Sequence, residues 1–130
     1  MNPVTWFSIP SDDVEKAAAF YNQAFGWDML PDIREKNPDY DFKIALNSPS
    51  NDDYVAKERG RVNGCIIKRA TGIKHPVVLV EVDSLEAAGR KIEAAGGKIV
   101  SEVIPMDSLN GKFFLATDVD GNMIEIFKNN

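Results

Sequence analysis

The sequence predicts an α+β fold built from two βαβββ modules. Two observations predict it. A strand-like segment, a capped helix and a terminating glycine occur twice, at a shift of 71 positions, and each copy is followed by candidate strands. The modules span about residues 3–69 and 75–128, within a single domain covering residues 1–130.

The first module opens with a predicted strand, Val4 to Ile9, rich in β-branched and aromatic residues and ended by Pro10-Ser11. A helix follows, in which Asp12 as N-cap and Glu15 form a capping box. Apolar residues at three- and four-residue spacing predict one buried helix face, and Gly26 ends the helix. The apolar stripe comprises Val14, Ala17, Ala18, Tyr21, Ala24 and Phe25.

The second module repeats this order. A strand is predicted over His75 to Val82, and the segment 83–86 (Asp-Ser-Leu-Glu) is again a capping box with Asp83 as N-cap. Gly96-Gly97 supplies the stop. The shift places Trp6 on Val77, and the helical stripe now comprises Leu85, Ala88, Ile92 and Ala95.

Further strands are predicted after each helix. In the second module they are residues 98–103, 112–117 and 122–128, with a loop over 104–111. In the first module they are residues 27–33, 41–46, 54–57 and 64–69, separated by segments rich in charged and turn-forming residues; 70–74 links the modules.

The composition excludes several functional classes. The net charge is −5 and no basic cluster is present, so nucleic acid is not an expected partner. The single cysteine, Cys65, excludes an internal disulfide and suits a reducing compartment. No long apolar run or signal peptide is visible, so we expect no membrane partner and a cytoplasmic location.

The stretch from Asp118 to Phe127 holds the principal candidate residue. Asp, Gly and Asn predict a tight turn, and the strand that follows places Met123, Glu125 and Phe127 on one face. A carboxylate among apolar residues needs a reason, because burying a charge is costly unless it is paired or bound. Two explanations of Glu125 are open: it lies on a solvent-exposed face or pairs with a lysine, or it faces a ligand or a metal.

These features together resemble a known family. The repeated module, Phe20-Tyr21 with Phe25-Gly26-Trp27, and the turn 118–122 followed by Glu125 resemble the vicinal oxygen chelate superfamily: glyoxalases, bleomycin resistance proteins and extradiol dioxygenases. The small glyoxalase-like members are the most similar. The resemblance implies mixed sheets that curl into a cup-shaped half-barrel with the helices outside, and a homodimer.

The resemblance also implies where a metal would bind. Metal-dependent members use a His or Gln near the start of each module's first strand and glutamates on the last strands. Here the first-strand positions fall on Trp6 and Val77, which offer no lone pair, while Glu125 fits. The remaining position lies within residues 64–67, where only Cys65 has a donor. We therefore expect no metal cofactor, since a catalytic ion needs about three protein ligands. A divalent metal held by His75, Glu125 and Cys65 is the alternative.

Strand parity predicts the lining of the cup, with Phe113 or Phe114 contributing and Phe42 and Met106 as walls. Cys65 is either a buried or cavity-lining thiol or a nucleophile, and Asn63 forms a turn or bulge or contacts ligand through its backbone. Glu125 is the catalytic candidate, a general base if desolvation raises its pKa. The ligand-binding candidates are Trp6, Ser8, Phe42, Asn63, Cys65, Val77, Leu79, Met106, Phe113, Met123 and Phe127.

Three functional classes stay open. The first is a metal-independent protein that binds a small, largely apolar ligand in the cup. The second is a lyase, isomerase or dioxygenase-type enzyme that uses Glu125 as base or metal ligand, and it predicts a second titratable or metal-ligating group beside Glu125. The third is an accessory domain whose cup is filled by its own side chains. We favour the first.

Overall fold

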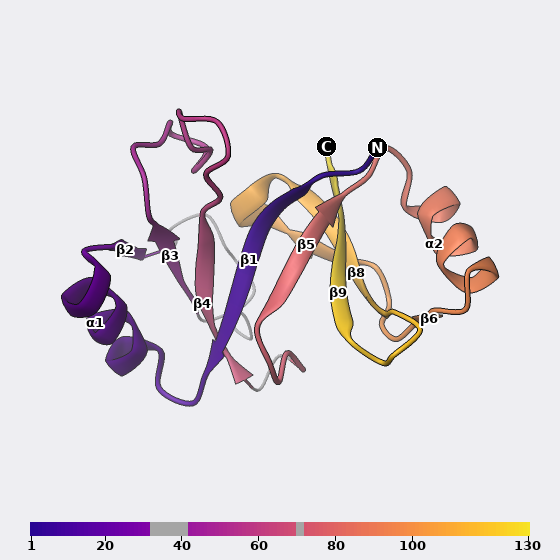
Figure 1. Cartoon of the computed structure of the whole chain (residues 1–130), viewed down its shortest axis with the longest axis horizontal. Helices are drawn as coiled ribbons and strands as arrows, with labels where there is room; N and C mark the ends of the chain where they lie inside the picture. The colour runs from indigo at the N-terminus through magenta and orange to yellow at the C-terminus, as the bar shows by residue number, and fades with distance from the viewer. Residues whose placement is uncertain (32–41, 70–71) are drawn as a thin grey trace. The chain divides into compact units, whose positions relative to one another are not determined.

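The computed structural model describes residues 1–31, 42–69 and 72–130 (Figure 1). The chain forms two compact units. The N-unit is Trp6–Pro76, and the C-unit is Met1–Thr5 together with Val77–Asn130. These units correspond closely to the two predicted modules, except that the first five residues group with the second module.

The N-unit follows the order βαβββ, as predicted. It contains β1 (Val4–Ser11), whose first residues belong to the C-unit, followed by α1 (Val14–Phe25), β2 (Asp28–Pro31), β3 (Phe42–Leu46) and β4 (Gly64–Lys68). The strand order is β2-β3-β4-β1. Strand β1 runs parallel to β4, while β2–β3 and β3–β4 are antiparallel.

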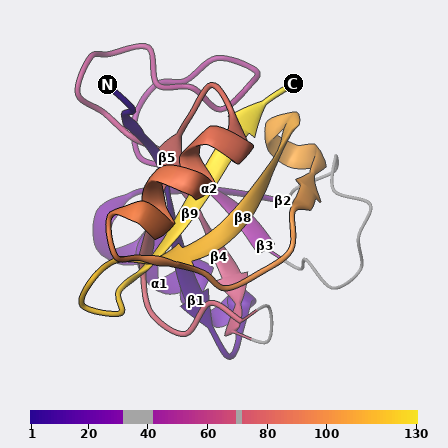
Figure 2. The same cartoon turned by 90° about the vertical axis from the view of Figure 1, so that its right-hand side faces the viewer.

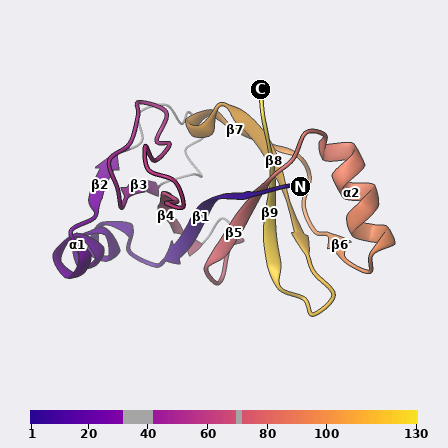
Figure 3. The ribbon, with the colours of Figure 1, turned by 45° about the horizontal axis from the view of Figure 1, so that its top comes forward.

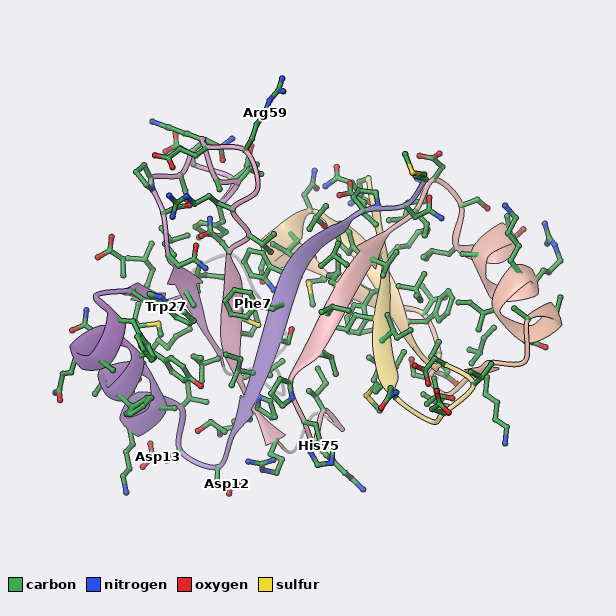
Figure 4. All side chains as sticks on the ribbon, viewed as in Figure 1. Phe7, Asp12, Asp13, Trp27, Arg59 and His75 are labelled. Atoms are coloured by element: carbon green, nitrogen blue, oxygen red, sulfur yellow. The ribbon has the colours of Figure 1, made fainter. Side chains whose placement is uncertain are left out.

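Helix α1 packs on one face of this sheet. The Nζ atom of Lys43 in β3 lies 3.0 Å from a carboxylate oxygen of Glu15 in α1. The ring of Phe7 in β1 lies 5.7 Å from that of Trp27, which stacks on Tyr21 of α1 at 5.0 Å (Figure 4). Odd-numbered residues of β1 and β3 therefore face the helix, and their even-numbered neighbours face away from it.

The C-unit repeats the arrangement with one additional strand. It contains β5 (Val77–Glu81), α2 (Leu85–Ala94), β6 (Lys98–Ile99), β7 (Ile104–Met106), the short helix η2 (Asp107–Leu109), β8 (Gly111–Thr117) and β9 (Met123–Asn129). The strand order is β5-β9-β8-β6, and β7 also pairs with β8 (Figure 3). The predicted α+β class is confirmed.

Helix α2 lies across β8 and β9 (Figure 2). Its contact with the sheet forms a compact apolar core in which Gly89 permits close approach, since a Cβ there would lie 3.0 Å from the Ile99 side chain. The sheet contributes even-numbered residues of β8 and β9 to this core. The buried members of this core are Val82, Leu85, Phe114, Ala116 and Ile126.

The helix caps differ from the prediction by one residue in each unit. Asp13, not Asp12, is the N-cap of α1, and its carboxylate accepts a hydrogen bond from Lys16 N at 3.1 Å. Ser84, not Asp83, caps α2 through Ala87 N at 3.2 Å. The predicted capping boxes are therefore wrong. Asp12 instead forms an ion pair with Arg69, whose Nε lies 3.0 Å from the Asp12 carboxylate.

The predicted buried faces of both helices extend too far toward the C-terminal ends. In α1 only Val14 and Ala18 are buried, and Phe25 is 62% exposed. The aromatic rings at this end pack on one another, with Phe25 and Trp27 centroids 5.9 Å apart. In α2 the predicted Ala95 is exposed, because the helix ends at Ala94.

Several strand boundaries also differ. Strand β1 continues through Pro10 to Ser11, paired with Ile67 and Lys68 of β4. The predicted strand 98–103 shrinks to two residues, and the predicted loop 104–111 contains β7 and η2. Residues 54–57 form no strand; Tyr54 has φ 65°. Parts of the predictions for 27–33, 41–46 and 70–74 lie outside the described residues.

The turn before β9 forms as predicted. Asp118 N donates to Asn122 O at 2.9 Å, and Gly121 N donates to Asp118 O at 3.1 Å. The Asp118 carboxylate accepts from the backbone of Asp120 and from both the backbone and the side chain of Asn122. Hydrogen bonds from the Asn122 side chain, and then its backbone, lower the pKa of Asp118.

We predict that Gly26→Ala destabilises the protein by about 1 kcal/mol, because alanine in the left-handed region is strained. Gly26 has φ 71° and a Cβ there meets nothing within 4 Å, so the backbone alone sets the cost. The measurement is urea denaturation. Gly26→Asn is the matched control and should lose less, since asparagine tolerates this conformation. Equal losses in the two variants would contradict the argument.

We also predict a pH-dependent contribution from Asp118. Its pKa is lowered in the folded state, so the unfolded chain takes up the proton first on acidification. Its stabilisation is therefore present above the unfolded pKa of about 3.9 and is lost as the pH falls through the folded pKa. Denaturation of wild type and Asp118→Asn at stepped pH should show their difference shrinking below about pH 4. A constant difference would rule this contribution out.

Candidate ligand-binding faces

Glu125 lies at the centre of the C-unit sheet. It sits on β9, with Leu79 of β5 and Leu115 of β8 as its Cα partners on either side. The α2 core contains Ile126 and Phe114, which belong to the opposite parity. Glu125 therefore occupies the face turned away from the helix, and its exposure is 0%. A carboxylate in these apolar surroundings is the most unusual feature of the sheet.

The other residues predicted for this face share its parity. Phe113 lies opposite Phe127 across the β8–β9 ladder, which settles the choice between Phe113 and Phe114. Both Phe113 and Phe127 are buried, as are Val77 and Leu79, whereas Met123 is half-buried. The C-unit thus brings together Val77, Leu79, Phe113, Met123, Glu125 and Phe127.

Met106 and Gly111 lie at one end of this face. Met106 is buried on β7 with Gly111 as its partner, and Gly111 also pairs with Asn129. A Cβ at Gly111 would overlap the ring of Phe127, so the missing side chain makes room for that ring. Ser108 of η2 is buried nearby in sequence and was not predicted; no pattern distinguishes it from an ordinary loop serine.

Glu81 is a second carboxylate that the sequence reasoning missed. It is half-buried on β5, and its Cα partner is Phe127. It therefore shares the parity of Glu125, two ladder positions along. The sequence could have indicated Glu81, because Val77, Leu79 and Glu81 are alternate residues of one strand and therefore share a face. The face opposite α2 carries two carboxylates rather than the single one predicted.

The corresponding face of the N-unit is turned away from α1. Ser8 of β1 and Cys65 of β4 are Cα partners, both almost fully buried, and the Cys65 thiol donates to the Ser8 hydroxyl at 3.4 Å. Trp6, two residues before Ser8, is 5% exposed. Ile44 of β3 is the other partner of Cys65, so this polar pair lies among apolar side chains.

Phe42 and Asn63 complete the placement of the predicted residues. Phe42 is buried opposite Ile67, on the same face as Cys65. The Asn63 side chain is engaged by the loop between β3 and β4. It accepts from Asn47 N at 3.0 Å and donates to Ser50 Oγ at 2.7 Å and to Tyr54 O at 2.8 Å. Its side chain organises this loop, from which Arg59 projects into solvent (Figure 4).

His75 is exposed in the segment before β5 (Figure 4). Among the residues that the structure describes, no three His, Cys, Asp or Glu side chains gather in a group able to hold a metal ion. In the same part of the chain no helix is long and apolar enough to span a membrane.

Residues 4–126 match the family model of the glyoxalase/bleomycin resistance protein/dioxygenase superfamily. The chain belongs to this superfamily. Among its relatives, a probable lactoylglutathione lyase of Vibrio cholerae is 26% identical over 90% of this chain and 83% of that protein. A probable chloroplastic lactoylglutathione lyase of Arabidopsis thaliana is 26% identical over 84% of this chain, but the match spans only 31% of that protein.

Several solved structures share the fold. A hypothetical protein of Bacillus halodurans C-125 superposes with a TM-score of 0.69 at 12% identity, covering 99% of this chain and 95% of that one. A variant methylmalonyl-CoA epimerase of Streptomyces coelicolor, in complex with 2-nitronate-propionyl-CoA, gives 0.69 at 9% identity with the same coverage. At these identities the likeness shows the fold and not the chemistry.

We predict that Cys65 is protected from thiol reagents in the native protein. Its exposure is 2%, and reaction requires an opening that exposes the sulfur. An opening free energy of about 3 kcal/mol slows labelling by about a hundredfold relative to unfolded chain. Labelling with a chromogenic disulfide, in buffer and in urea, measures this ratio. Native labelling as fast as that of free cysteine would instead indicate an accessible, nucleophilic thiol.

Proposed function

We propose that this superfamily member binds a small, largely apolar ligand on the face of the C-unit that is turned away from α2. Phe127 supplies apolar contacts, and Glu125 supplies the polar anchor. The observation that carries the proposal is the fully buried carboxylate of Glu125 between Leu79 and Leu115. A homodimer, expected from the family resemblance, stays a prediction.

The chemistry of that position selects the ligand class. A fully buried carboxylate beside Leu79 and Leu115 is a specific chemical feature of this face. An ionised carboxylate only accepts hydrogen bonds, and it favours a cation or a strong donor. The surrounding phenyl and leucyl groups suit an aromatic or aliphatic body. The expected ligand is therefore an apolar molecule with one cationic or hydrogen-bond-donating group.

A second candidate function is catalytic. The relatives include proteins named as probable lactoylglutathione lyases, and one structural neighbour is an epimerase. Epimerisation at carbon requires a proton to leave and return, which a buried carboxylate can perform as general base. Glu81 on the same face is the second titratable group that this function requires. A lyase or isomerase that uses Glu125 as base is the reaction class supported here, ahead of a dioxygenase.

The binding function predicts a charge preference. Naphthylmethylamine, a cation, and naphthylmethanol, its neutral counterpart, share one apolar body. Wild type should bind the amine about tenfold more tightly, because hydrogen bonds to charged groups contribute about 1.5–3 kcal/mol. Glu125→Gln should remove the preference and keep the affinity for the alcohol. Calorimetric titration measures both probes.

Two controls sharpen this test. Asp120→Asn removes an exposed carboxylate and should leave both affinities unchanged, whereas Phe127→Leu should weaken both. Equal affinity of wild type for the two probes would refute the anchoring role of Glu125. Binding of neither probe would indicate an accessory domain with filled faces. Turnover of lactoylglutathione, lost about a hundredfold or more in Glu125→Gln, would favour the enzyme.

A further inference from the structure

The internal repeat identifies the N-unit counterpart of Glu125. The shift of 71 positions that relates Trp6 to Val77 also relates Ser8 to Leu79. Ser8 is the Cα partner of Cys65 in the parallel β1–β4 pair, and Leu79 is the Cα partner of Glu125 in the parallel β5–β9 pair. Cys65 therefore occupies in the N-unit the position that Glu125 occupies in the C-unit. The sequence alone left this position open within residues 64–67.

Two further observations support the equivalence. The helix caps Asp13 and Ser84 obey the same shift of 71, so the repeat keeps its register from the first strand into the helix. Cys65 and Glu125 also lie on the helix-free face of their own sheet, with exposures of 2% and 0%. Gly64 and Ile66, the neighbours of Cys65, have the opposite parity.

The four positions that the superfamily resemblance associates with a divalent ion can now be judged by their donors. They are Trp6 and Cys65 in the N-unit, and Val77 and Glu125 in the C-unit. The indole of Trp6 only donates a hydrogen bond and the isopropyl group of Val77 has no donor atom. The Cys65 thiol donates to the Ser8 hydroxyl at 3.4 Å, a bond that a metal at the sulfur would replace. Each unit therefore offers one candidate donor residue at these positions, short of about three protein ligands.

We infer that this chain departs from the metal-dependent members and has no divalent-ion affinity at these positions, with Cys65 standing in place of the fourth ligand. The inference deepens the proposed function, because it leaves Glu125 to hold the ligand directly. It derives from donor chemistry and strand register, and its test needs no ligand.

The first test is direct titration of untagged wild-type protein with Zn²⁺, Ni²⁺, Mn²⁺ and Mg²⁺, together with elemental analysis. We expect far less than one equivalent of metal per chain and no shift in Tm, since an ion that binds the folded state would raise it. One equivalent per chain, lost in Glu125→Gln or Cys65→Ala, would overturn the inference. The charge preference of the ligand probes is measured separately, so metal uptake does not decide it.

The second test compares Cys65→Ala and Cys65→Ser with wild type in the same titrations. Both variants should show the same low metal uptake as wild type, because the inference gives Cys65 no role as a ligand. Uptake that falls in either variant would overturn the inference. Circular dichroism checks the folding of both.

Discussion

Strand alternation constrains this molecule more than any other feature. Each sheet has one helix packed on one face, and every second side chain of each strand must face the other way. The paired positions Ser8–Cys65 and Leu79–Glu125 follow from that alternation together with the parallel register. Because a register slip of one residue would exchange the faces, these polar side chains are held away from the helices by the whole ladder.

The sequence predicted much of this arrangement because alternation and apolar spacing are local signals. The order of elements, the turn at residues 118–122, the left-handed Gly26 and the parity of Glu125 all follow from neighbouring residues. The strand boundaries were less accurate. Residues 98–103 have strand-like composition, but only Lys98 and Ile99 form ladder pairs with β8. Val100 N then donates to Leu115 O, and the Ser101 hydroxyl accepts from Leu115 N. Pairing is a property of the fold rather than of the segment.

The errors at the helix ends have a similar origin. Asp12 and Asp13 are equivalent as N-cap candidates by composition, and the ion pair with Arg69, 57 positions away, separates their roles. The stripe of α1 was extended to Phe25 because its spacing is helical, yet the Phe25 ring packs on Phe20, Tyr21 and Trp27 and stays largely exposed. The position of Cys65 relative to Glu125 likewise required the strand register, which no local pattern contains.

The grouping of Met1–Thr5 with the C-unit bears on how the chain assembles. The carbonyl of Pro3 accepts a hydrogen bond from Glu81 N, so residues at the very start of the sequence complete a structure whose other members lie beyond residue 76. A fragment limited to residues 77–130 would therefore lack the backbone hydrogen bond from Glu81 N to Pro3 O that the folded C-unit contains.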